Sequence, residues 1–143
     1  MPVKKRIDPP MHTAEHLLNQ TMVRMFGCGR CFSAHIEKKK SKCDYRFDRP
    51  LKDGEIERIE AAVNEKIAEN LPVTEFYESR QSARKTFDLD RLPDEAGDGI
   101  RIVSIGDYDA CPCIGHHVAL TGEIGGFRIT TTDFADGVLR IRF

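Results

Sequence analysis

Two pairs of histidine and cysteine residues, one near each end of the chain, have the spacing of metal ligands. His12 and His16 are four positions apart near the start, and Cys113 and His117 are four positions apart near the end. Side chains at positions i and i+4 of a helix lie on one face, so both imidazoles of the first pair can reach one ion. Zinc prefers nitrogen and sulfur ligands in tetrahedral geometry. The four residues therefore predict a zinc site, provided that the two ends of the chain meet.

A carboxylate lies inside the first pair. The segment His12-Thr-Ala-Glu15-His16 matches H-x-x-E-H, in which two histidines bind metal and the glutamate activates water. Glu15 leaves the helix about 100° round from His16, so an ion pair on the helix surface is an equal alternative. The motif alone also occurs in helices whose histidines bind no metal. The second pair of metal-binding residue types makes a chance match to a metal motif less probable. A closed structural zinc site with four protein ligands is a further possibility.

The first pair needs a helix to hold it, and the sequence provides start and stop signals for one. Asp8 can cap a helix with Pro9 at its first position, and the stretch from Met11 to Phe26 ends at Gly27. We therefore place both histidines on this helix.

Two hairpins are indicated by alternating apolar residues. Residues 32–36 and 43–47 alternate on either side of a lysine-rich turn, and residues 126–143 alternate about Asp136-Gly137. In the first hairpin Ser33 and His35 are expected on one face, with the apolar residues on the other: Phe32, Ala34, Ile36, Cys43, Tyr45 and Phe47.

Between the hairpins the clearest helix covers residues 53–70. Asp53 is its expected cap, and its expected buried stripe is Ile56, Ile59, Val63 and Ile67. We then expect a strand at 73–78, a short helix at 79–86, a loop at 88–99 and a buried strand at 100–105. Because helices and strands do not alternate strictly, the order favours an α+β fold, a mostly antiparallel sheet with helices packed on it.

Composition indicates a single domain over residues 1–143. The chain is long enough to bury a core without disulfides, and its net charge is −1. No apolar run approaches the roughly 18 residues of a membrane helix, and the first ten residues are charged rather than signal-like, so we expect a cytoplasmic protein that binds no membrane. Five cysteines, an odd number, favour thiols and metal ligands over disulfides.

The motifs together resemble the editing domain shared by alanyl- and threonyl-tRNA synthetases, especially its freestanding trans-editing relatives of the AlaX type. Residues 12–19 resemble the family's H-T-A-x-H-L-L opening, and residues 113–118 resemble its C-x-x-x-H-V signature. Shorter stretches in the same order are similar to it at 44–48, 59–65, 70–73, 103–107 and 121–125. The match extends over nearly the whole chain.

This resemblance implies hydrolysis of the ester that joins a wrong amino acid to the 3′ end of tRNA. Its expected substrate is serine misattached to tRNA for alanine, followed by glycine, and its cofactor is zinc. Carried over residue by residue, the resemblance gives four zinc ligands: His12, His16, Cys113 and His117. Glu15 is the candidate for water activation, and Ser33 is the candidate for binding the amino acid. The tRNA acceptor end would be held through phosphates by basic clusters such as Lys38-Lys39-Lys40.

Departures from the family pattern leave some assignments open. The usual C-G-G-T-H reads C-I-G-H-H here, so His116 competes with His117 as a ligand, although the C-x-x-x-H-V frame favours His117. Cys111 offers an alternative sulfur, and the frame again favours Cys113. Cys28-Gly-Arg-Cys31 is not explained by the resemblance; it could bind a second metal with Cys43 or take part in redox chemistry.

Two other functions fit the same ligands. A small zinc peptidase built on H-x-x-E-H would depend on Glu15 and not on Cys113. A non-catalytic RNA-binding module stapled by zinc would have a closed site, and chelation would unfold it.

Overall fold

The computed structural model of the protein describes residues 7–87, 89 and 99–143. Its helices and strands follow one another in this order: α1 (Pro9–Phe26), β1 (Ser33–Ile36), β2 (Ser41–Arg46), α2 (Glu55–Ala68), β3 (Val73–Ser79), α3 (Arg80–Arg84), β4 (Gly99–Ile105), β5 (Asp109–Pro112), the short 3₁₀ helix η2 (Thr121–Ile124), β6 (Thr131–Ala135) and β7 (Val138–Arg142). Helices and antiparallel sheets together confirm the expected α+β class.

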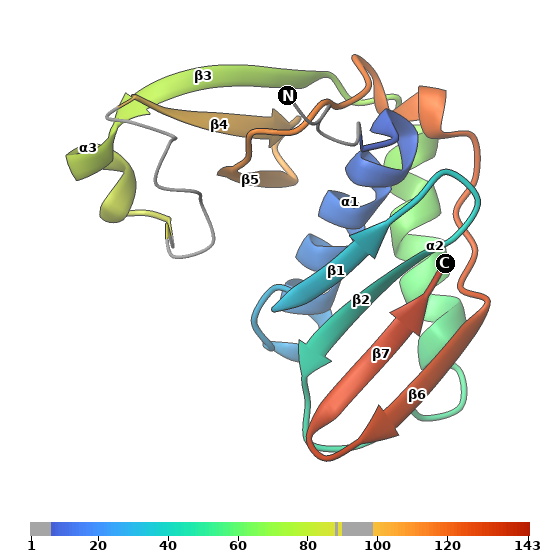
Figure 1. The fold of residues 1–143 in the computed structure, drawn as a ribbon. Coiled ribbons are helices and arrows are strands. Elements are labelled where there is room, and N and C mark those ends of the chain that lie inside the picture. The colour runs from blue at the N-terminus through green and yellow to red at the C-terminus, as the bar shows by residue number, and fades with distance from the viewer. Residues whose placement is uncertain (1–6, 88, 90–98) are drawn as a thin grey trace, which may run out of the picture.

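Helix α1 begins and ends where the sequence predicts. The Asp8 carboxylate accepts a hydrogen bond from the backbone N–H of Met11 at 3.2 Å, and Gly27 ends the helix with a φ of 67°. Every residue from 12 to 19 is buried. A helix buried on all sides has other elements on all sides, and α1 contacts α2, η2, β1 and β5. It therefore forms the centre of the molecule (Figure 1).

Four strands form the larger sheet, in the order β1-β2-β7-β6, all antiparallel. Helices α1 and α2 cover one face of it (Figure 1). Both predicted hairpins are present. The main core lies between helices and sheet, and its fully buried members include Leu17, Leu18 and Met22 of α1, Ile59 and Val63 of α2, and Cys43, Tyr45 and Ile141 of the sheet.

One residue of the first hairpin departs from the prediction. Phe32 was expected to face the core with Ala34 and Ile36, yet it is 37% exposed. Its ring lies 3.9 Å from the guanidinium carbon of Arg46, a cation–π arrangement that shields the ring without burying it.

The start of α2 also differs from the prediction. Of the predicted stripe, Ile59, Val63 and Ile67 are buried and Ile56 is partly buried. Asp53, however, is not the cap. Gly54 occupies the cap position with a φ of 84°, which glycine adopts without strain. No side chain caps the first turn, and the Glu55 carboxylate instead accepts the backbone N–H of Lys52 and two bonds from Arg49, which ties the preceding loop to the start of the helix.

A smaller sheet, in the order β3-β4-β5, lies beside the N-terminal half of α1 (Figure 1). The expected strands and short helix appear as β3, β4 and α3, whereas β5 was not predicted, because its four residues include a proline and show no clear alternation. The expected loop at 88–99 lies almost entirely outside the described residues. The strands thus form two sheets instead of one. No helix in the described ranges has the length and apolarity to span a bilayer.

Candidate metal centre

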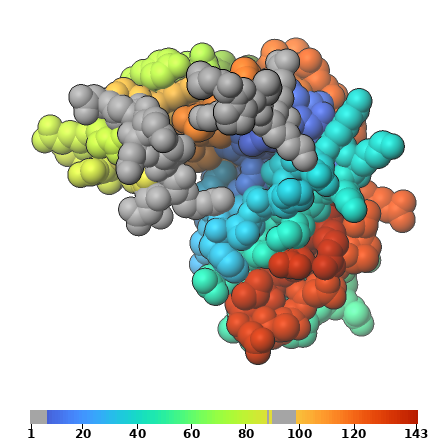
Figure 2. All heavy atoms as spheres, in the orientation of Figure 1, coloured from blue at the N-terminus to red at the C-terminus, as the bar shows by residue number. Residues whose placement is uncertain are grey.

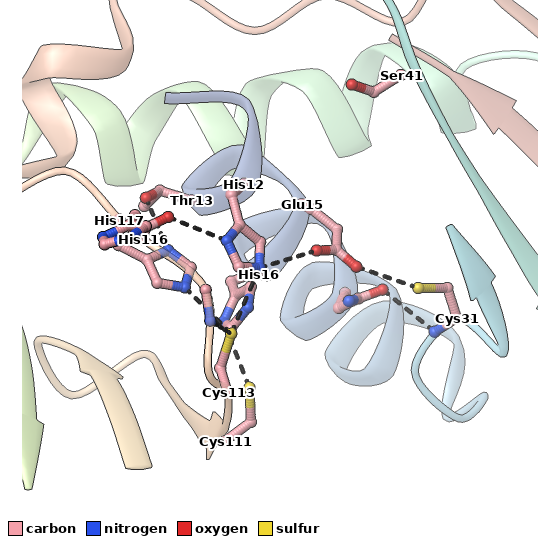
Figure 3. Close-up of polar contacts among 12 residues, drawn as sticks. His12, Thr13, Glu15, His16, Cys31, Ser41, Cys111, Cys113, His116 and His117 are labelled. Carbon is pink, nitrogen blue, oxygen red and sulfur yellow. Dashed lines mark hydrogen bonds and ion pairs between the residues drawn. The ribbon is translucent and has the colours of Figure 1, made fainter. Parts of the chain in front are cut away.

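The structure brings the two predicted ligand pairs together. One ligand atom from each of His12, His16, Cys113 and His117 lies within 4.8 Å of every other. The Cys113 sulfur is 3.4 Å from Nε2 of His12 and 3.5 Å from Nε2 of His117. Figure 3 shows the two histidines of α1 facing the loop that follows β5. Two segments about a hundred residues apart in the sequence therefore meet at one point.

The outer nitrogens of two of these rings are held by other groups. Nδ1 of His12 lies 3.0 Å from the backbone carbonyl of His116, which only accepts, so Nδ1 carries the proton. Nδ1 of His117 lies 2.9 Å from Oγ1 of Thr13, whose own proton goes to the carbonyl of Pro9. Both Nε2 atoms are thereby left as bases that point at the Cys113 sulfur. Metal-binding histidines are typically fixed in this manner.

The third ring, that of His16, is oriented from β5. Its Nδ1 lies 3.3 Å from the Cys111 sulfur and 3.6 Å from the Asp109 carboxylate. Asp109 is fully buried at its side chain and is itself held by Arg30 at 2.6 Å and by Gln20 at 3.0 Å. The unpredicted strand β5 thus supplies the partners that turn His16 toward the other ligands.

The electrostatics of the cluster favour deprotonated ligands at two positions. Burial alone would raise the pKa of Cys113, but the polar contacts of its sulfur with the rings of His117, His12 and His16 outweigh it and lower this pKa to about 3. Burial lowers the pKa of His117 to about 4. A thiolate and a neutral imidazole are the forms that bind metal.

Each of His16 and Asp109 shifts the pKa of the other. Burial would lower the pKa of His16, but the electrostatic interaction with Cys111 and the hydrogen bond with Asp109 raise it well above its ordinary value. Burial would raise the pKa of Asp109, but the hydrogen bond from His16 and the charge of Arg30 lower it to about 2. A bound cation would take the place of the His16 proton.

These residues fit zinc on three counts. Three imidazole nitrogens and one thiolate are a donor set that zinc accepts, and their mutual distances suit one tetrahedral ion. Gly115 also leaves room for the His12 ring, since a Cβ built there would lie 2.3 Å from Cε1 of His12. Only glycine at this position lets the loop approach the helix so closely.

The remaining sequence candidates are placed as follows. Glu15 is buried, and its Oε1 lies 3.7 Å from Nε2 of His12, so it faces the cluster. His116 is exposed and contributes its carbonyl, while Cys111 contacts His16 from behind and is not one of the four converging residues. Ser33 pairs with Asp44 across the hairpin and is not among the described residues that line the neighbouring cleft.

The cluster lies at the wall of a large open cleft of about 1530 Å³. Its lining includes His12, Glu15, His16 and Cys113 together with residues of β1 and β5. Figure 2 shows the molecule hollowed between the part that carries β3–β5 and the part that carries β1, with α1 between them. The candidate ligands are thus within reach of a molecule bound in the cleft.

Sequence reasoning did not find every residue that matters here. Thr13 and Arg30 were missed, because a threonine inside H-T-A and an arginine inside a C-x-x-C loop carry no metal-site signal of their own. Asp107 and Asp109 both precede the second ligand pair, and either acid could hydrogen-bond a ligand imidazole from outside. Among the described contacts only Asp109 does so.

Comparisons with known proteins find relatives among the alanine–tRNA ligases. A family model described as the threonyl and alanyl tRNA synthetase second additional domain matches residues 100–142. An alanine–tRNA ligase of Francisella tularensis subsp. tularensis is 36% identical over 138 residues, and one of Francisella philomiragia is 33% identical over the same length. Each alignment covers 91% of this chain and 15% of the ligase. Together these matches support an AlaX-like editing-domain family for the chain.

The family match and the ligand pairs overlap only in part. The editing-domain model covers β4 to β7, and so includes Cys113 and His117 but not the histidines of α1. This chain spans about 15% of the length of the curated ligases it matches. The resemblance drawn from the motifs is confirmed at the level of the family.

Proposed function

We propose that this editing domain is a zinc-dependent aminoacyl-tRNA deacylase. Its family supports tRNA editing in general, and we take its substrate to be serine wrongly esterified to tRNA for alanine, with glycine second. The observation that carries the proposal is the convergence of three imidazole nitrogens and one thiolate at the wall of the cleft.

The chain's own residues have separate parts in this chemistry. Zinc, when bound, polarises a carbonyl and lowers the pKa of a water molecule. Thr13 and Asp109 hold the rings of His117 and His16 in the orientation that presents Nε2. Glu15 is the base that we propose to accept the proton of the attacking water, since its carboxylate faces the ligands and hydrogen-bond reach through one water is enough.

The cleft is large for an amino acid alone. Typical small-molecule pockets measure roughly 300–1,000 Å³, whereas this one is about 1530 Å³. It has room for the terminal nucleotide of an acceptor end as well as for its serine. The size of the cleft therefore supports a nucleic-acid conjugate as the substrate.

A basic turn follows a strand that lines this cleft. Lys38, Lys39 and Lys40 are exposed between β1 and β2, and three residues of β1 line the cleft. In contrast, Arg140 and Arg142 of β7 are paired with Asp44 and Asp133. We propose that the lysine turn contacts phosphates of the acceptor stem, which would position the tRNA without reading its sequence.

A closed structural zinc is the second function that an observation favours. Four protein ligands fill a tetrahedral ion, and structural sites are closed in this way. Chelation distinguishes the two. A structural ion would unfold the domain when removed, whereas our proposal expects loss of hydrolysis with the helical circular dichroism signal retained.

A zinc peptidase is less well supported. It requires only the histidines and Glu15, yet the Cys113 sulfur lies within 3.5 Å of two ligand nitrogens. A peptidase would lose activity in E15Q and keep it in C113A.

The direct test is release of serine from Ser-tRNA(Ala) by the purified 143-residue chain, with correctly charged Ala-tRNA(Ala) as the control substrate. H16A and C113A should lose about a hundredfold or more of the rate together with their zinc. H116A is the matched control, because only its backbone carbonyl touches the site, and it should keep both. Full activity in C113A, or no release of serine or glycine by the unaltered chain, would refute the proposal.

The role of Ser33 stays a prediction. If Ser33 binds the amino acid, S33A should change the preference for serine over alanine while leaving zinc content unchanged. If it serves only the hairpin, S33A should leave the preference as it is.

A further inference from the structure

A second cluster of metal-binding side chains lies next to the first. Glu15 of α1, Cys31 of the loop before β1 and Cys43 of β2 each offer a ligand atom within 4.8 Å of the others. All three are buried, with exposed fractions of 8%, 1% and 0%. We propose that they form a second site for a thiophilic divalent cation of the zinc type.

The spacing of the cluster fits one ion. The Cys31 sulfur is 3.5 Å from Oε2 of Glu15. A tetrahedral centre with a Zn–S bond of about 2.3 Å and a Zn–O bond of about 2.0 Å separates sulfur from oxygen by about 3.5 Å. The residues therefore need little movement to close around the ion.

The surroundings supply support and access. Asn19 accepts a hydrogen bond from the backbone N–H of Cys31 at 3.2 Å and another from the Tyr45 hydroxyl at 2.8 Å, which fixes the loop against the sheet. Glu15, Asn19 and Cys31 also line the cleft, so an ion and a water molecule as fourth ligand can enter from that side. An entry path and a held outer shell are what a working site requires.

The ligand types set the kind of ion. Two sulfurs with one carboxylate suit zinc and similar transition metals, whereas magnesium and calcium prefer oxygen alone. Both cysteines are thiols in the structure, and the ion would displace their protons. The C-x-x-C motif does not act as a pair here, because Cys28 is directed to the carbonyl of Met22 instead.

Glu15 stands between the two clusters. Its Oε1 faces Nε2 of His12 at 3.7 Å, and its Oε2 faces Cys31 (Figure 3). One oxygen can therefore ligate the second ion while the other remains directed at the first site. The inference concerns binding alone and does not depend on the proposed hydrolysis.

Metal content after equilibration with zinc and gel filtration tests the second site. The unaltered chain should retain two zinc ions per molecule and C31A/C43A only one, a loss of half. C28A is the matched control and should retain two. The pair H16A/C113A should retain one, held by the second cluster. Zinc that C31A/C43A retains in full, or zinc that H16A/C113A loses completely, would overturn the proposal.

Because Cys43 belongs to the core, its replacement can impair folding, so a measurement on the unaltered chain is needed as well. Cobalt titration should give sulfur-to-metal charge-transfer absorption that keeps rising through the second equivalent. A plateau at one equivalent, or a mass two hydrogens lower that shows a Cys31–Cys43 disulfide in place of the ion, would contradict the inference. Failure of the deacylase assay would leave these readouts unaffected, so the two proposals fail separately.

Discussion

Single residues next to the ligands decide whether the ligands can act together. Three imidazoles and a sulfur that merely lie close would repel or pair with one another. Here each ring has a partner on its outer side. The carbonyl of His116 contacts the His12 ring, and the hydroxyl of Thr13 contacts the His117 ring. The carboxylate of Asp109 contacts the His16 ring. The residue types of the cluster and their spacing could be predicted from the sequence, and so could the presence in it of the His117 side chain and not that of His116. The partners could not, because a carbonyl and a threonine hydroxyl gain their role only from the meeting of distant segments.

The hydroxyl of Thr13 gives the first test at this scale. T13V keeps the shape of the side chain but removes the acceptor for Nδ1 of His117, so the ring is no longer fixed with Nε2 toward the metal. Zinc affinity, measured by competition with a chromophoric chelator, should fall about 10- to 100-fold.

T21V is the control for T13V. It makes the same change two turns along α1, where the hydroxyl bonds the Leu17 carbonyl and Tyr108 and touches no ligand. Its zinc affinity should match that of the unaltered chain. Equal affinities for T13V and T21V would show that the Thr13 contact does not hold the ring.

Gly115 provides a steric test. In G115A the new methyl group would lie 2.3 Å from a ring carbon of His12, so the loop and the helix must separate. We expect zinc affinity to fall about tenfold or more. G126A is the matched control, since nothing lies within 4 Å of the position of its Cβ. Should G115A bind zinc as tightly as G126A, the close approach of loop and ring would be unimportant.

At the scale of elements, caps and hairpin patterns locate most of the fold. The boundaries of α1, the buried stripe of α2 and both hairpins follow from periodicity, glycine and proline in the sequence. Strand β5 did not follow from them. Four residues with a proline gain their strand structure from pairing with β4, a tertiary effect that local pattern does not carry. Because β5 contains Asp109, the sequence did not predict the contact between Asp109 and His16.

The first turn of α2 gives a prediction about acidity. Hydrogen bonds from Arg49 and from the backbone of Lys52 lower the pKa of Glu55 to about 2, below its unfolded value of 4.5. A lowered pKa stabilises the fold above the unfolded value, and this stabilisation is lost as the pH falls toward the folded value. E55Q should therefore be less stable than the unaltered chain by about 1–2 kcal/mol at pH 7, and the difference should shrink between pH 4.5 and 2.

Urea unfolding over a range of pH measures this difference. E57Q, a matched change at an exposed position in the same turn, should alter stability by less than about 0.5 kcal/mol at any pH. A difference between E55Q and the unaltered chain that stays constant down to pH 2 would rule out the ion pair as its cause.

At the scale of the whole molecule, α1 contacts both the larger and the smaller sheet. One antiparallel sheet was expected, and two are present, with the cleft between them. Thr121 is fully buried at their junction. Its hydroxyl donates to the Lys66 carbonyl at the end of α2 and accepts the Leu71 backbone N–H just before β3, both at 2.8 Å. The Thr121 hydroxyl thus links the residue before β3 to α2 through two hydrogen bonds.

Removal of this hydroxyl tests the junction. T121V leaves a buried carbonyl and a buried N–H without this partner, and each such group costs about 1–3 kcal/mol, so we expect a loss of about 2 kcal/mol or more in the free energy of unfolding. T130V, at an exposed site, should change it by less than about 0.5 kcal/mol. Equal stability of the two variants would show that the sheets are held together elsewhere.

The central claim is that residues from both ends of the chain hold one metal ion, and anomalous diffraction at the zinc edge tests it most directly. In crystals grown with zinc, our account predicts a peak bounded by Nε2 of His12, His16 and His117 and by the sulfur of Cys113. The peak should vanish in C113A and persist in H116A. Absence of any peak at this position, or a peak held by the side chain of His116 or Cys111 in place of these atoms, would contradict the account.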